Sequence, residues 1–169
     1  ITATPPIIHP DPAAVAAAVE TLATAQRPVM MAGTGVKWSR GGPALQRFAE
    51  ETALPTFVNG MGRGQMPHGS PQLFNRVRRE ALRECDVFVL AGSPLDFRLR
   101  FGGAVSDGAR IVQLDIDATL IGQNRPADVA VVGNLGVVFD RMLDEIGASN
   151  AAVDFSDWTA ELRAREDQL

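Results

Sequence analysis

Residues 86–91 read Asp-Val-Phe-Val-Leu-Ala and form an apolar run that ends at Gly92. A strand that is apolar on both faces must be covered on both faces, which is typical of a parallel sheet. Similar short runs occur elsewhere in the chain, at Pro28–Ala32 (PVMMA), Pro55–Val58, Arg110–Leu114 (RIVQL) and Asp128–Val132 (DVAVV). The repeated pattern predicts at least five parallel strands.

Helical segments separate these runs, as parallel pairing requires. Asp11 followed by Pro12 is typical of a helix start, and apolar residues recur at helical spacing beyond it. We expect helices over residues 12–25, 42–52, 73–84 and 135–146. The predicted fold is a doubly wound, Rossmann-like α/β fold, with a mainly parallel sheet of five to six strands and helices on both faces.

Composition narrows the class of protein. The 169 residues suffice for one domain with its own core, and the net charge of −4 without a basic block argues against nucleic acid or an anionic membrane as the main partner. A single cysteine, Cys85, can form neither an internal disulfide nor a thiolate zinc site. No apolar run approaches the roughly 20 residues of a membrane span. We therefore expect a cytoplasmic protein that uses neither membrane nor nucleic acid.

The ends of the chain differ from its middle. Residues 1–10 are proline-rich and predict a linker, residues 11–147 carry the α/β pattern, and residues 148–169 predict a second linker with a helical tail. Phe155, Trp158 and Leu162 have roughly helical spacing in that tail. This organisation is typical of a middle domain taken from a longer chain, while frayed termini of a small stand-alone protein remain the alternative.

In an open parallel sheet, ligands bind beyond the carboxyl ends of the strands. Each predicted strand is followed there by a polar or glycine-rich cluster. In chain order the clusters are Gly33-Thr34-Gly35, Asn59-Gly60 in the glycine-rich loop 59–64, Gly92-Ser93 with Asp96 and Arg98, Asp115-Ile116-Asp117, and Gly133-Asn134. Singly, these are explained as well by tight turns, a surface ion pair or helix caps. Together they predict one edge that an extended adenine nucleotide could line.

Several catalytic patterns are missing from the sequence. The Gly-x-Gly-x-x-Gly fingerprint is not completed after Gly33-Thr34-Gly35, and Asn59 replaces the acidic residue that would bind a ribose. His9 and His68 are the only histidines. There is no Ser/His/Asp arrangement and no Walker loop. The sequence favours a binding domain and predicts no catalytic or metal-ligating residues.

An ordered set of motifs resembles a known family. They are Arg27-Pro28-Val29 leading to Gly33-Thr34-Gly35, Ala53-Leu54-Pro55-Thr56, Asn59-Gly60-Met61-Gly62-Arg63-Gly64, residues 86–92 running into Asp96-Phe97-Arg98-Leu99 and Phe101-Gly102, Gln113-Leu114-Asp115-Ile116-Asp117 with Ile121-Gly122, and Gly133-Asn134. From Pro28 to Ile146, about seven tenths of the chain, the sequence resembles the central domain of thiamine-diphosphate-dependent enzymes of the acetolactate synthase, 2-hydroxyacyl-CoA lyase and oxalyl-CoA decarboxylase group.

The resemblance implies a division of labour. Flanking pyrimidine- and pyrophosphate-binding domains would hold thiamine diphosphate and Mg²⁺ in a homodimer or homotetramer, so this chain alone would be inactive. The central domain holds FAD or ADP in some members. Nucleotide contacts are implied for Gly33, Thr34, Gly35, Val58, Asn59, Gly60, Gly92, Ser93, Asp96, Arg98, Asp115, Ile116, Gly133 and Asn134.

Two departures bear on which nucleotide is bound. Pro94 stands where flavin-binding synthases carry an arginine, and residues 65–73 are too short for their flavin loop, so the chain looks more like the ADP-binding members. Two other classes remain open. A stand-alone NAD-dependent enzyme of sirtuin-like or transhydrogenase-like fold has similar glycines, although a sirtuin-like histidine and four zinc cysteines are missing. The third possibility is a purely structural spacer domain.

Overall fold

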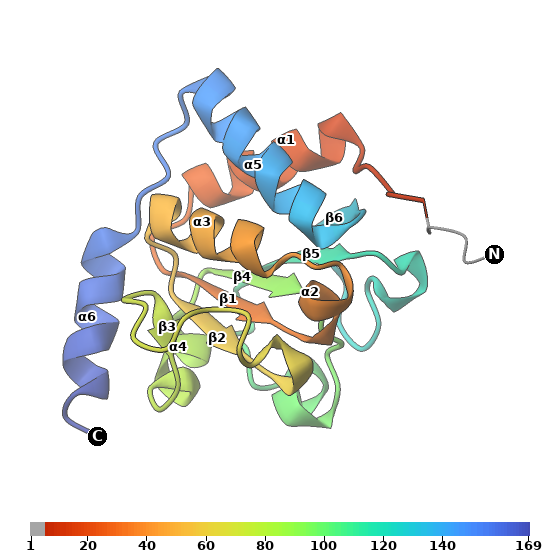
Figure 1. Ribbon diagram of the computed structural model, residues 1–169. Coiled ribbons are helices and arrows are strands. Elements are labelled where there is room, and N and C mark those ends of the chain that lie inside the picture. The colour runs from red at the N-terminus through yellow and green to blue at the C-terminus, as the bar shows by residue number, and fades with distance from the viewer. Residues whose placement is uncertain (1–5) are drawn as a thin grey trace.

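The computed structural model describes residues 6–169 (Figure 1). One sheet of six strands runs through the molecule in the order β3-β2-β1-β4-β5-β6. The strands are β1 (Pro28–Ala32), β2 (Thr56–Val58), β3 (Leu73–Phe74), β4 (Val87–Ala91), β5 (Arg110–Asp115) and β6 (Val129–Val132). Every neighbouring pair is parallel, which confirms the predicted doubly wound α/β class.

Helices cover both faces of the sheet (Figure 1). They are α1 (Pro12–Ala23), α2 (Thr34–Trp38), α3 (Gly42–Thr52), α4 (Arg78–Glu84), α5 (Leu135–Ser149) and α6 (Ser156–Glu166). Side chains of α1, α3 and α5 share one buried cluster, and those of α4 and α6 share another. The sheet therefore separates two apolar cores.

The alternation of side chains along the strands explains why the strand sequences are apolar throughout. Met30 and Ala32 of β1 belong to the first core, whereas Val29 and Met31 belong to the second. Because successive strand residues point to opposite faces, a strand covered on both sides needs an apolar residue at every position. All five residues of β1 are buried, as are all five of β4.

The expected helix over residues 73–84 is wrong in its first part. Leu73 and Phe74 form the edge strand β3, paired with Thr56 and Phe57 of β2, and the helix begins only at Arg78. The Phe57 and Phe74 rings lie 5.9 Å apart between centroids. A two-residue strand carries no periodicity of its own, so its apolar residues are indistinguishable in the sequence from the start of the following helix.

Smaller boundaries also differ from the expectation. The first helix ends at Ala23 rather than residue 25, and α5 continues to Ser149 instead of ending at residue 146. Asn150 then closes α5 in the left-handed conformation, with φ of 51°. Asparagine tolerates this conformation better than most residues, which makes it a natural helix terminator.

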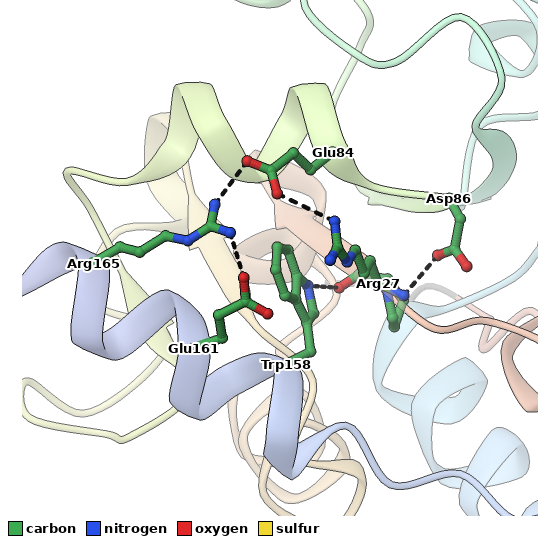
Figure 2. A network of polar contacts seen from close by, with 7 residues as sticks. Arg27, Glu84, Asp86, Trp158, Glu161 and Arg165 are labelled. Atoms are coloured by element: carbon green, nitrogen blue, oxygen red, sulfur yellow. Dashed lines mark hydrogen bonds and ion pairs between the residues drawn. The ribbon is translucent and has the colours of Figure 1, made fainter.

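Helix α6 packs against the face of the sheet that α4 covers. Its Trp158 and Leu162 are buried in the second core, and Trp158 Nε1 donates a hydrogen bond to the Pro28 carbonyl at 3.2 Å. Figure 2 shows Arg165 between the carboxylates of Glu161 and Glu84, while Arg27 contacts the other Glu84 oxygen. The predicted helical tail thus packs against the sheet, whereas the domain boundaries at residues 10 and 147 stay predictions. Among residues 6–169, no helix is long and apolar enough to cross a membrane.

Candidate functional site

The strand register brings the predicted clusters to one edge of the sheet. Ala32 at the end of β1 lies opposite Val58 and Ala91, and Ala91 lies opposite Leu114. Asp115 in turn lies opposite Val132. Because these strands are parallel and in register, the residues that follow them leave the sheet at the same edge. The expected gathering of loop tips is therefore present.

The loops after β1 and β4 approach each other closely. Gly33 N–H donates to the Ala91 carbonyl and Gly35 N–H donates to the Gly92 carbonyl, both at 2.8 Å. A Cβ atom on Gly33 would lie 2.6 Å from both the Gly92 oxygen and Ser93 Cβ. Gly92 itself has φ of +59°, which favours glycine. These glycines are required by backbone contact between the two loops.

Polar side chains connect the loop after β2 to this contact between the β1 and β4 loops, which we call the glycine crossing. Asn59 Nδ2 donates to Ser93 Oγ at 2.8 Å, and both residues are buried. The Met61 N–H donates to Thr34 Oγ1 at 3.2 Å. Gly60 adopts φ of +49°, and a Cβ there would lie 2.7 Å from Thr34 Oγ1. Seven predicted residues thus form one contiguous cluster, namely Gly33, Thr34, Gly35, Asn59, Gly60, Gly92 and Ser93. Val58 stands beside it at the end of β2.

Asp96 and Arg98 contact each other. The Asp96 carboxylate accepts a hydrogen bond from Arg98 N–H at 2.9 Å and another from Arg98 Nη1 at 2.6 Å. Asp96 thereby caps the 3₁₀ segment η2 (Phe97–Gly102). A surface ion pair was one of the explanations that the sequence left open for these two residues. Because the pair is partly exposed, its contribution to stability is small.

Asp115 is the buried carboxylate of this edge, with 4% of its surface exposed. Burial raises the pKa of Asp115, although hydrogen bonds from the Asp117 and Ile116 backbone N–H groups partly offset that effect. The Asp117 N–H lies 3.0 Å from its Oδ1. Further donors, such as the hydroxyls of a ribose, would stabilise the ionised form. Asp115 is therefore suited to accept hydrogen bonds from a sugar.

Gly133 and Asn134 face the amino-terminal segment of the chain. Asn134 N–H donates to the Ile8 carbonyl at 2.8 Å, and its side chain caps α5 by accepting from Gly136 N–H at 3.2 Å. A Cβ on Gly133 would lie 3.1 Å from Pro10 N. The structure thus brings both residues to the edge, where residues 8–10 of the same chain contact them.

Exposed apolar side chains lie on the same loops, and of these only Ile116 is among the predicted nucleotide contacts. Trp38, Met61, Phe97 and Phe101 are all exposed, and Trp38 is 71% exposed. They follow β1, β2 and β4, as does Ile116 after β5. The available signal was their position, since each lies within one of the polar clusters or no more than three residues beyond it. They give the polar edge an apolar border.

The polar groups at this edge are hydrogen-bond donors and acceptors. In the part of the chain that the structure describes, no three or more His, Cys, Asp or Glu residues are grouped to hold a metal ion. Burial raises the pKa of Cys85 to about 12, so its thiol stays protonated at neutral pH and is a poor nucleophile. The edge offers backbone groups, hydroxyls and one buried carboxylate, which are suited to holding a ligand.

Comparison with known proteins identifies the family. A family model described as the thiamine pyrophosphate enzyme central domain matches residues 15–142. The chain is 36% identical to the acetolactate synthase large subunit IlvG of Mycobacterium tuberculosis over 93% of this chain and 28% of that protein. It is 30% identical to 2-hydroxyacyl-CoA lyase 2 of Caenorhabditis elegans over 89% of this chain and 24% of that protein. Thus it spans only about a quarter of these relatives' length.

The fold comparison agrees with the family. Benzoylformate decarboxylase from Polynucleobacter necessarius superposes with a TM-score of 0.67 at 16% identity, over 85% of this chain and 29% of that one. At this identity the likeness shows the shared α/β architecture alone.

Proposed function

The chain belongs to the thiamine pyrophosphate enzyme central-domain family, and from this premise we propose that it is the central part of a larger thiamine-diphosphate-dependent enzyme. The relatives include a synthase and a lyase, and each is about four times as long as the matched region. The proposed enzyme makes or breaks a carbon–carbon bond next to a carbonyl group. Assays of the full-length protein for acetolactate formation from pyruvate and for cleavage of 2-hydroxyacyl-CoA would test this proposal. If the protein consumed neither pyruvate nor 2-hydroxyacyl-CoA, the proposal would be contradicted.

We propose that thiamine diphosphate and Mg²⁺ are held by domains that flank this one. When bound, thiamine diphosphate supplies the carbon nucleophile and electron sink for the reaction. This proposal is supported by the family match, since the chain spans only about a quarter of the length of its relatives. The residues of this chain would contribute by ordering the flanking domains within a homodimer or homotetramer.

We propose that the edge of the sheet at the carboxyl ends of the strands binds the adenosine part of ADP or FAD. The observation that carries this proposal is the convergence of buried Asp115 with the glycine crossing at Gly33 and Gly92 on one edge. The carboxylate would accept the ribose hydroxyls, and the missing side chains would let a ligand approach the backbone. Pro94 and the short stretch 65–73 favour ADP over FAD.

Calorimetric titration of the full-length protein with ADP and with FAD tests the site. We expect Asp115→Asn to weaken nucleotide binding about tenfold, because it removes a charge-assisted acceptor. Asp107→Asn is the matched control: it makes the same change at an exposed turn before β5, at the opposite edge of the sheet. Failure of both nucleotides to bind would leave the domain as a structural spacer. Consumption of NAD would instead favour the stand-alone enzyme.

A further inference from the structure

A cavity of about 290 Å³ lies between α4 and η2, on the face of the sheet opposite α3 and α5. Five arginines line it: Arg78, Arg79 and Arg83 from α4, and Arg98 and Arg100 from η2. Leu82, Gly103 and Ala104 complete the lining, which contains no acidic residue. All charged residues of the lining are therefore basic.

Most of this positive charge is unpaired. Among the ion pairs of residues 6–169, Arg98 is bound to Asp96, while Arg78, Arg79, Arg83 and Arg100 take part in none. Like charges repel at short range, so clustering them is unfavourable unless an anion offsets it. The chain as a whole carries −4, which makes this local excess of positive charge unusual for the molecule.

The backbone holds one of these arginines in an unfavourable conformation. Arg100 has φ of +53° and Phe101 has φ of +54°, so two successive residues with side chains occupy the left-handed region. Such strain persists where the surrounding structure requires it and is concentrated at functional sites. Here it accompanies an Arg100 side chain that lines the cavity.

We infer that this cavity binds a compact polyphosphate, with the diphosphate group as its recognised element. The guanidinium group binds phosphate through two parallel hydrogen bonds, and several of them together match an anion of more than one negative charge. The diphosphate could be free or carried by a nucleotide. This inference stands apart from the proposed adenosine site, with which the cavity shares only Arg98.

Inorganic pyrophosphate is the appropriate probe because it lacks the adenosine that the edge would hold. In calorimetric titration of the full-length protein saturated with thiamine diphosphate and Mg²⁺, which occupy the proposed site in the flanking domains, we expect Arg79→Gln/Arg83→Gln to weaken pyrophosphate binding about tenfold or more. Arg47→Gln/Arg141→Gln is the matched control, since it removes the same charge from exposed positions on α3 and α5. It should change the dissociation constant less than about twofold.

Three results would overturn the inference. These are no pyrophosphate binding to the unaltered protein, an equal loss in both double variants, and binding to the isolated chain but not to the full-length protein. Equal loss would mean a diffuse charge effect, and the last result would mean that another domain covers the cavity. Circular dichroism would verify that each variant is folded.

A second titration distinguishes the source of the diphosphate. ADP is titrated into Asp115→Asn with and without the Arg79→Gln/Arg83→Gln change. Binding that depends on the arginines supports a nucleotide-borne group, whereas binding of pyrophosphate alone supports a free anion. Loss of ADP binding in Asp115→Asn with pyrophosphate binding retained would show that the two sites are independent.

Discussion

Gly33 lies where three loops meet, and its lack of a side chain is what allows them to meet. Its hypothetical Cβ would approach the Gly92 oxygen, Ser93 Cβ and Asn59 Oδ1 within 2.8 Å. Two of these three atoms belong to residues that hydrogen-bond to each other, Asn59 and Ser93. Moving either residue away from Gly33 would strain that hydrogen bond, so these neighbours cannot easily make room for a side chain at position 33.

We expect Gly33→Ala to lower the free energy of unfolding by about 2 kcal/mol through overpacking. The matched control is Gly108→Ala, because an added Cβ there meets nothing within 4 Å. Chemical denaturation monitored by fluorescence would measure both. Equal midpoints for the two variants would contradict the proposed crowding at the crossing.

At the scale of elements, Glu84 at the end of α4 connects that helix to α6 and to the start of β1. A hydrogen bond from Arg165 lowers the pKa of Glu84, with the charges of Arg165 and Arg27 adding to this against the opposing effect of burial. Its two oxygens lie 2.7 Å from Arg165 Nη1 and 3.3 Å from Arg27 Nη1. Glu84 and its two arginine partners are partly exposed, so these ion pairs contribute only modestly to the free energy of unfolding.

The stability of this contact should depend on pH. A carboxyl whose pKa is lowered by folding stabilises the folded state above its ordinary pKa of 4.5, and the contribution is lost as pH falls through the lowered value. We expect Glu84→Gln to cost about 0.5 kcal/mol at pH 7 and progressively less on acidification below pH 4.5. Denaturation curves at several pH values would measure this difference.

The control for this pH dependence is Glu80→Gln on the same helix. In the described part of the chain, Glu80 takes part in no ion pair. Its substitution therefore makes the same chemical change on the same helix without removing an ion pair. If the two variants had parallel stability profiles, Glu84 would not be the group that responds.

At the scale of the whole molecule, the two cores depend on segments far apart in the sequence. Trp158 of α6 donates to the Pro28 carbonyl of β1 and is packed into the second core. Arg27 and Arg165 lie over its ring at 5.2 and 5.6 Å from the centroid. The C-terminal helix is therefore part of the packed unit that includes the first strand.

We expect Trp158→Ala to lower the free energy of unfolding by about 3–5 kcal/mol, because it leaves a large cavity and unpairs the Pro28 carbonyl. Trp38→Ala removes the same side chain from a position that is 71% exposed, and it should be nearly neutral. Thermal unfolding followed by calorimetry would compare the two. A small loss for Trp158→Ala would mean that α6 contributes little to the fold.

The parallel α/β class and the positions of most strands can be predicted from the sequence alone. Two-sided burial leaves an unbroken apolar run, as in residues 87–91, and this signal is local. The positions of the polar clusters were predictable for the same reason, since each directly follows a strand. The cap formed by Asn134 also follows from short-range geometry.

The contacts that those clusters make could not be predicted from the sequence, because they depend on the tertiary structure. The strand register, a long-range property, brings Asn59 to Ser93 across 34 residues. The packing of the amino-terminal segment likewise places residues 8–10 against Gly133. The edge strand β3 exists because of its pairing with β2, since two residues carry no pattern of their own. The basic cavity likewise depends on the packing of α4 against η2. Side-chain spacing along a chain reports local conformation, whereas these contacts arise from how distant segments pack.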